Sequence, residues 1–185
     1  MTAAGTGTAA TGPGIAVLVL LGLTAVLGLV LAARGERTRR AWDAVLLVLL
    51  VALAAGLAWV AGDVSDGLVE GVAVAAVLAA IAAGGPVTTA VLRAADPSAV
   101  GVPGGPQDPD VLRGGAWIGV LERAGVASAL LVGSAEGLVV VLAVKGLGRY
   151  AELRAPAAAE RFIIGTLASA LWAAACVGVA VLVRS

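Results

Sequence analysis

The sequence predicts an all-α fold, a polytopic bundle of about six transmembrane helices. Of its 185 residues, 61% are hydrophobic and only 13% are charged, and the mean hydropathy is +1.05. Soluble domains contain about 45–50% apolar and about 25% charged residues. Because one membrane span takes about 20 apolar residues, six spans with their connections would use nearly the whole chain. The lipid bilayer is therefore the first partner that we expect.

The N-terminal half contains three apolar segments. Residues 1–13 are small and uncharged and predict a disordered tail. Apolar runs follow at residues 14–33 and 41–61, separated by a cluster of arginines. The third run, residues 68–93, is interrupted by the sequence Gly-Gly-Pro at positions 84 to 86. Because proline removes a backbone donor and glycine lowers helix propensity, we expect a kink or break near position 85.

A segment rich in proline and glycine, residues 94–114, divides the chain. It holds four prolines and has no apolar period, which predicts a loop between two membrane halves, residues 14–93 and 115–185. The second half contains apolar runs at residues 115–132, 134–150 and 162–183. Because charged residues interrupt the first two of these runs, an alternative stays open. In it, five or four helices span fully, and the fourth and fifth form a half-inserted hairpin.

Basic residues predict the orientation, since short loops rich in Lys and Arg stay in the cytoplasm. With both termini outside, ten basic residues lie on the inner side and only Arg184 lies outside. The ten are Arg34, Arg37, Arg39, Arg40, Arg93, Arg113, Lys145, Arg149, Arg154 and Arg161. Trp42, Trp59, Trp117 and Tyr150 fall at predicted interfaces, where amphipathic rings are preferred, whereas Trp172 falls in mid-span.

The composition argues against several functions. Twelve basic and twelve acidic residues give zero net charge, so we expect no nucleic-acid partner. The chain has no histidine, the commonest general base and metal ligand. Its single cysteine, Cys176, excludes an intrachain disulfide and a cysteine cluster. Zinc-protease, nucleophile-elbow and Walker motifs are missing. We therefore expect no cofactor, no metal and no catalysis.

Glu122 and Lys145 are predicted to form an intramembrane ion pair. In an antiparallel hairpin that turns at Gly133 and Ser134, the two residues lie at equal depth. A charge at the centre of a span costs about 2.5–3.5 kcal/mol, which favours pairing. The pair is interpreted as a structural contact that fixes helix register or as part of a transport or catalytic site. Arg123 points roughly 100° away and must find another partner or reach the interface by snorkelling.

A second charged group follows on the fifth segment. Lys145, Arg149 and Glu152 are predicted to share one helix face by their spacing. Arg154 and Arg161 follow at the same predicted interface. Together with Arg123, these residues are candidates for contact with an anionic lipid headgroup or an ion. The alternative interpretation is that they are only the positive-inside signal of a short loop.

Small residues indicate where helices pack. In lipid, helices associate by close backbone approach at small residues spaced four apart. On the last segment, Thr166, Ser169, Ala173 and Cys176 line the face that we expect to pack into the bundle. Pairs spaced four apart occur elsewhere at Gly67 and Gly71, Gly115 and Gly119, Gly133 and Gly137, and Gly165 and Ser169.

Three charged motifs in the C-terminal half resemble a known family. The segments WIGVLER, LAVKGLGRY and ERFIIGTLAS place charged residues at fixed positions among apolar ones. They are similar to the C-terminal half of an uncharacterised family of small bacterial integral membrane proteins, a domain of unknown function. The resemblance covers about 60 residues and implies a bacterial inner-membrane location, without an activity, substrate or cofactor. Eleven Arg against one Lys, with abundant Ala, Gly and Val, is typical of an actinobacterial genome.

Two functional hypotheses follow from these observations. In the first, the protein is a structural or accessory membrane component without catalysis, partnered by itself or by another membrane protein. In the second, it is a small channel or transporter that uses Glu122, Arg123 and Lys145. Few polar residues are available to line an aqueous path, which favours the first hypothesis.

Overall fold

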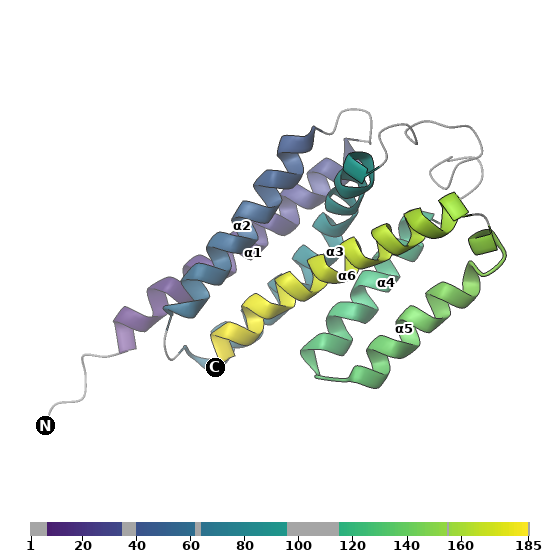
Figure 1. The fold of residues 1–185 in the computed structure, drawn as a ribbon. Coiled ribbons are helices and arrows are strands. Elements are labelled where there is room, and N and C mark those ends of the chain that lie inside the picture. The colour runs from purple at the N-terminus through teal and green to yellow at the C-terminus, as the bar shows by residue number, and fades with distance from the viewer. Residues whose placement is uncertain (1–6, 35–39, 62–63, 96–114, 155, 185) are drawn as a thin grey trace, which may run out of the picture.

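The protein is helical throughout the part of the chain that the structure describes. The computed structural model describes residues 7–34, 40–61, 64–95, 115–154 and 156–184. The elements are α1 (Gly7–Ala33), α2 (Ala41–Trp59), α3 (Asp66–Ala95), α4 (Gly115–Leu131), α5 (Ala135–Gly148), the short 3-10 helix η3 (Glu152–Arg154) and α6 (Pro156–Arg184), as Figure 1 shows. The predicted fold class, an all-α bundle of six helices, is confirmed.

Four of these helices, α1, α2, α3 and α6, are long and apolar enough to cross a membrane. They mark the chain as a membrane protein. Helices α4 and α5 have 17 and 14 residues, which corresponds to about 25 and 21 Å. Both lengths fall short of the roughly 30 Å hydrocarbon core. The structure therefore supports the alternative of four full spans beside a shorter α4–α5 hairpin.

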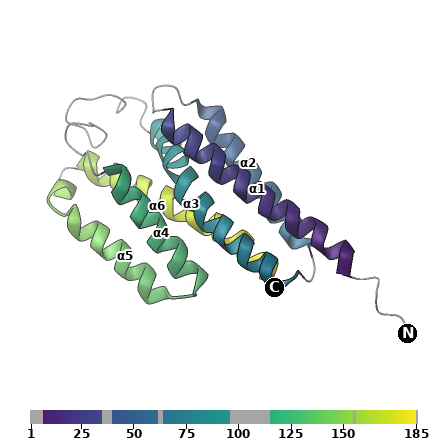
Figure 2. The same ribbon diagram turned by 180° about the vertical axis from the view of Figure 1, so that it is seen from behind.

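Helices α3 and α6 form the centre of the bundle. Helix α3 packs on α1, α4 and α6, and α6 packs in addition on α2, α4 and η3. The hairpin lies to one side of this bundle, as Figures 1 and 2 show from opposite directions. Helix α5 packs mainly on α4 and has no buried residue. The two predicted halves therefore share one core, across the α3–α6 contact.

Small side chains allow the helices to approach closely. The buried face of α3 is largely alanine, from Ala73 to Ala83. Where α1 approaches the α3 backbone, a Cβ atom added to Gly28 would lie 2.5 Å from Cα of Ala83. Among the glycines predicted to mark packing, Gly71 and Gly165 do face neighbouring helices, whereas Gly67 faces open space. Gly133 lies in a turn and not on a packing face.

The predicted tail is wrong at residues 7–13, and the break predicted near position 85 is absent. Helix α1 begins at Gly7 and includes Pro13, so residues 7–13 are not a tail. Its alanines favour helix, and one proline costs that helix only one backbone donor. Helix α3 likewise continues without a break through Pro86 to Ala95. Pro86 is buried among packed neighbours, and tertiary packing routinely overrides local helix propensity.

Most of the other residues that the sequence predicts to be non-helical lie outside the part of the chain that the structure describes. Residues 1–6 of the predicted tail and residues 96–114 of the predicted linker lie outside the described residues. Positions 94 and 95, which the sequence places in the linker, instead end α3. The first half therefore extends two residues further than the sequence predicts.

Charge is distributed unevenly between the two ends of the bundle. The helix ends that carry Arg34, Arg40, Arg93 and Arg161 lie together, and Arg184 lies at the opposite end with the start of α1 (Figure 1). That opposite end also carries the acidic residues Asp66 and Glu70, in the first turns of α3. Apart from Arg123 and Arg184, the described basic residues therefore lie toward one end, as the predicted orientation requires.

We predict that the basic end faces the cytoplasm. Cys176 is buried and is first replaced by alanine to give a background without reactive thiols. Ser65 and Arg154 are exposed at opposite ends. In intact cells, an impermeant thiol reagent should label Ser65→Cys and should label Arg154→Cys only after lysis. The reverse pattern would invert the topology.

We also predict that Gly28 cannot accept a larger side chain. Gly28→Val should lower the free energy of unfolding by about 1–3 kcal/mol, since the branched side chain must displace the α3 backbone. Gly22 on the same helix has no atom within 4 Å of an added Cβ, so Gly22→Val is the matched control. Thermal unfolding in detergent measures both. Equal losses would show that the α1–α3 approach is not what restricts position 28.

Candidate functional site

A charged cluster lies where the hairpin meets the bundle. Nζ of Lys145 on α5 lies 2.5 Å from Oε2 of Glu122 on α4, so the structure contains the contact predicted from the hairpin register. Each side chain is 18% exposed. Nζ of Lys145 also lies 5.9 Å from the ring centroid of Phe162 on α6, within the range of a cation–π contact. The pair therefore joins α4 to α5, and the lysine also reaches α6.

The turn of the hairpin sets the register of this pair. Gly133 has a φ of +69°, a left-handed conformation that glycine adopts without strain. The hydroxyl oxygen of Ser134 then accepts a hydrogen bond from the backbone N–H of Gly137 at 3.0 Å. This N-cap satisfies one of the free donors at the start of α5. The predicted turn at Gly133 and Ser134 is confirmed.

Arg123 is held by α3, roughly 100° around α4 from the ion pair. Its Nε donates a hydrogen bond to the carbonyl oxygen of Ile81 at 3.0 Å. A Cβ atom on Gly84 would overlap Cδ of Arg123, and one on Gly119 would lie 3.1 Å from its Nη1. The glycines thus provide space for the arginine side chain against the α3 backbone. Arg123 has the internal partner that its position required.

Trp172 makes a second backbone contact with the same stretch of α3. Its indole Nε1 donates to the carbonyl oxygen of Ala79 at 3.3 Å, and only 5% of the residue is exposed. A Cβ atom on Gly84 would lie 3.1 Å from Cδ1 of Trp172. Gly84 is therefore the point where α3, α4 and α6 meet. This contact explains why Trp172 lies in mid-span while Trp42, Trp59 and Trp117 are exposed near helix ends.

The space beside the ion pair is small. A cavity of about 10 Å³ lies against Glu122, Lys145, Thr166 and Ser169, and this is about the smallest probe volume that can hold one water molecule. The hydroxyl of Thr166 is buried and has no hydrogen-bond partner among the described residues, so a single water would satisfy it. Among all the residues that the structure describes, no group of three His, Cys, Asp or Glu side chains lies close enough together to hold a metal ion. Ser169, Ala173 and Cys176 are buried in the bundle, as predicted.

The predicted basic face of the fifth helix is wrong in its extent. Helix α5 ends at Gly148, Arg149 is its C-cap residue, and Glu152 begins the separate helix η3. Glycines at positions 146 and 148 lower the helix propensity there. Lys145, Arg149 and Glu152 therefore do not share one helical face. Arg154 is exposed and Arg161 is half-buried near the start of α6.

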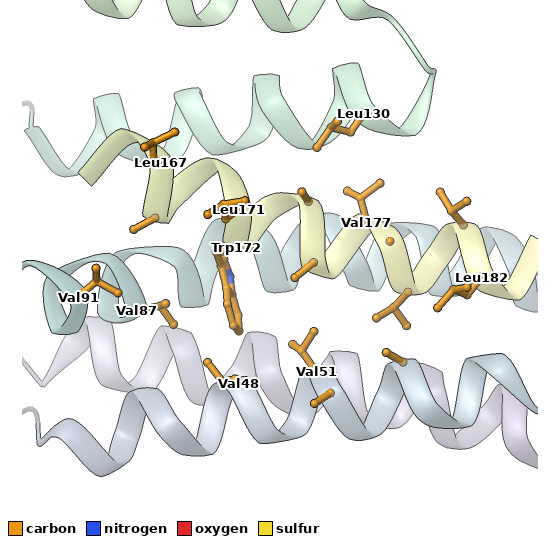
Figure 3. A pocket seen from close by; sticks show the side chains of 18 of the residues that line it. Val48, Val51, Val87, Val91, Leu130, Leu167, Leu171, Trp172, Val177 and Leu182 are labelled. Atoms are coloured by element: carbon orange, nitrogen blue, oxygen red, sulfur yellow. The ribbon is translucent and has the colours of Figure 1, made fainter. Parts of the chain in front are cut away.

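A separate apolar groove lies between α2 and α6. It has a volume of about 1030 Å³ and is lined almost entirely by apolar side chains, as Figure 3 shows. Val48 and Val51 of α2 form one wall, Leu167 and Leu171 of α6 belong to the other, and Val87 of α3 lies between them. The sequence did not predict this groove, because apolar residues that face lipid and those that line a hollow have the same pattern.

Comparisons with known proteins yield no relative. The sequence matches no protein-family model, and neither a curated protein nor a solved structure is significantly similar to it. The resemblance of the C-terminal half to a bacterial family therefore stays a prediction. The function must be argued from the charged cluster and the groove alone.

The Gly-Gly-Pro sequence of the third segment and Arg123 are connected in a way that the sequence did not predict. Nε of Arg123 binds the carbonyl oxygen of Ile81, which lies three residues before Gly84. The signal was present, since two adjacent glycines leave the backbone open to a long side chain. The acceptor was not identifiable, because every residue of the facing helix offers a carbonyl group.

We predict that Glu122 and Lys145 are energetically coupled. Glu122→Gln or Lys145→Met alone should each cost about 1–3 kcal/mol, because each leaves one charge unpaired in apolar surroundings. The double variant should recover part of that loss, with a coupling energy of about 0.5–3 kcal/mol. Thermal unfolding of all four proteins in detergent measures the cycle. Strictly additive losses would show that the contact contributes nothing.

We further predict that the adjacent glycines Gly84 and Gly85 differ in how well they tolerate substitution by alanine. Gly84→Ala should destabilise by about 1–3 kcal/mol because the methyl group displaces the Arg123 side chain. A Cβ on Gly85 would meet Nη2 of Arg123 only at 3.8 Å, so Gly85→Ala should be neutral or stabilising by up to about 1 kcal/mol. Introducing Arg123→Ala should reduce the cost of Gly84→Ala. A cost unchanged by that substitution would contradict the proposed packing.

Proposed function

We propose that the protein is a structural or accessory component of a membrane, without catalysis of its own. The observation that carries this proposal is that the intramembrane charges have partners inside the protein. Glu122 binds Lys145, and Arg123 binds the α3 backbone. Charged groups that serve a moving ion or substrate typically line a water-filled cavity, whereas only about 10 Å³ lies beside this pair.

The cluster serves to attach the hairpin to the four spanning helices. Two neighbouring residues on α4 extend to different helices, Glu122 to α5 and Arg123 to α3. Both contacts are short and specific in geometry, so they fix the depth and rotation of α4. A hairpin held in this way presents the exposed apolar side chains of α5, including Val139, Val140 and Val144, to lipid or to a partner. The proposed partners are a second copy of the chain or another membrane protein.

The proposed location is a bacterial inner membrane, with both termini outside. The resemblance noted in the sequence supports the location, and the gathering of basic residues at one end supports the orientation. An actinobacterial source is proposed on the Arg-rich, Lys-poor composition alone.

An ion-flux measurement tests the proposal against the channel or transporter alternative. Purified protein is reconstituted into liposomes that carry K⁺, Na⁺ or H⁺ gradients, with fluorescent readouts of pH and of membrane potential. The expected flux equals that of protein-free liposomes, for wild type and for Glu122→Gln. A flux that wild type supports and Glu122→Gln abolishes would overturn the proposal and assign transport to the cluster. Val139→Ala, on the exposed face of α5, is the matched control.

A further inference from the structure

The small cavity beside the ion pair lies where three helices meet. Each of α4, α5 and α6 contributes at least one polar side chain to its lining, namely Glu122, Lys145, Thr166 and Ser169. The other residues of the lining are apolar, namely Val126, Val141, Leu142 and Ala170. Polar groups therefore face this space from three helices, with apolar walls between them. Such a space suits a ligand that forms hydrogen bonds in several directions.

The hydroxyl of Thr166 needs a partner that the helices around it do not supply. Its Oγ1 atom is buried and has no hydrogen-bond partner among the described residues. A buried hydroxyl without a partner destabilises the folded state, because the hydroxyl has lost the water that solvates it in the unfolded chain. Since Thr166 lines the cavity, a ligand in the cavity is within reach of this side chain.

The ion pair retains the capacity to bind a further ligand. Nζ of Lys145 donates a hydrogen bond to Oε2 of Glu122. An ammonium group has three donors, and an ionised carboxylate has about four acceptor sites. Their contact uses one donor and one acceptor site, so the remaining ones can bind a ligand in the cavity. A buried water needs two to four polar partners, which the ion pair and Thr166 together can provide.

The size and charge of the cavity favour water over other ligands. Its volume of about 10 Å³ is about the smallest that can hold one water molecule, so a hydrated ion or an organic molecule does not fit. A metal cation would lie beside the ammonium of Lys145, and an anion would lie beside the carboxylate of Glu122. Each of these ions would meet a like charge, whereas a neutral water does not.

We propose that one water molecule binds in this cavity and links Thr166 of α6 to the Glu122–Lys145 pair. The hydroxyl of Thr166 donates a hydrogen bond to the water, and the water donates one to the carboxylate of Glu122. This bridge attaches the hairpin to α6, in addition to the contact of Lys145 with Phe162. The inference goes beyond the accessory role and does not depend on it, because ion flux and water binding are measured separately.

Two identical substitutions should have different effects on stability. Thr166→Val keeps the shape of the side chain but removes a partner of the water. It should lower the unfolding temperature in detergent by about 2–4 °C, as expected for one lost hydrogen bond. Thr88 on α3 is the matched control, since its Oγ1 is also buried without a partner among the described residues, but Thr88 lines neither this cavity nor the apolar groove.

Thr88→Val should leave the unfolding temperature unchanged or raise it, because a methyl group is buried at lower cost than an unpartnered hydroxyl. A Thr166→Val variant that is as stable as wild type would contradict the proposal. Equal losses for the two valine variants would do the same, since they would show that the cavity is not what makes Thr166 different.

A further variant shows whether the water acts through the ion pair. In the double variant Glu122→Gln, Lys145→Met, the water loses its charged partners. Thr166→Val should therefore lower the unfolding temperature of the double variant by less than that of wild type. A loss of the same size in both backgrounds would mean that the hydroxyl of Thr166 has its partner elsewhere, and the bridge to the ion pair would be wrong.

The single lysine of the chain permits a direct measurement of the water. Because Lys145 is the only lysine, protein made with isotope-labelled lysine gives one side-chain Nζ signal. Solid-state NMR in bilayers measures the transfer of magnetisation from water to this nitrogen. Wild type, Thr88→Val and Thr166→Ser, which keeps the hydroxyl, should show the transfer, whereas Thr166→Val should lose most of it. Equal transfer in wild type and Thr166→Val would overturn the proposal.

Discussion

The backbone carbonyls of α3 that point toward α4 and α6 are the contacts on which the C-terminal half depends. Lipid offers no hydrogen-bond partner to a polar side chain, so a buried arginine or indole takes its partner from the protein. Arg123 finds Ile81, and Trp172 finds Ala79. Both acceptors lie within one turn of the same helix. One short stretch of α3 thus holds the hairpin and the last spanning helix in place.

Alanine and glycine on α3 make this arrangement feasible. A helix in lipid gains little from burying large apolar side chains, because the tails around it are equally apolar. Close approach of backbones provides the van der Waals contact instead. The same small residues that let α1 approach at Gly28 leave the α3 carbonyls within reach of an arginine and an indole. Close packing and polar satisfaction therefore have one cause in this bundle.

The sequence predicts the helices and the ion pair well, and the other contacts poorly. Apolar length identifies the spans, and symmetry about the turn places Glu122 opposite Lys145, because both arguments use only spacing along the chain. The partner of Arg123 lies 42 residues away on a helix that no local rule positions. The continuity of α3 through Pro86 could not be predicted either. The sequence shows that a proline lacks a backbone donor, but it does not show the packing that compensates for that loss. The groove depends on how α2 and α6 lie relative to each other. The spacing of residues along the chain does not show this arrangement.

The position of the two α3 acceptors has a consequence for the order in which the protein is made. A chain synthesised from its N-terminus completes α3 before Arg123 leaves the ribosome, so the carbonyl of Ile81 is already in place when the arginine arrives. Trp172 is added about fifty residues later, and its acceptor lies within the same turn of α3 as the acceptor of Arg123. Synthesis therefore completes α3, which carries both acceptors, before it adds the hairpin and α6 that pack on that helix.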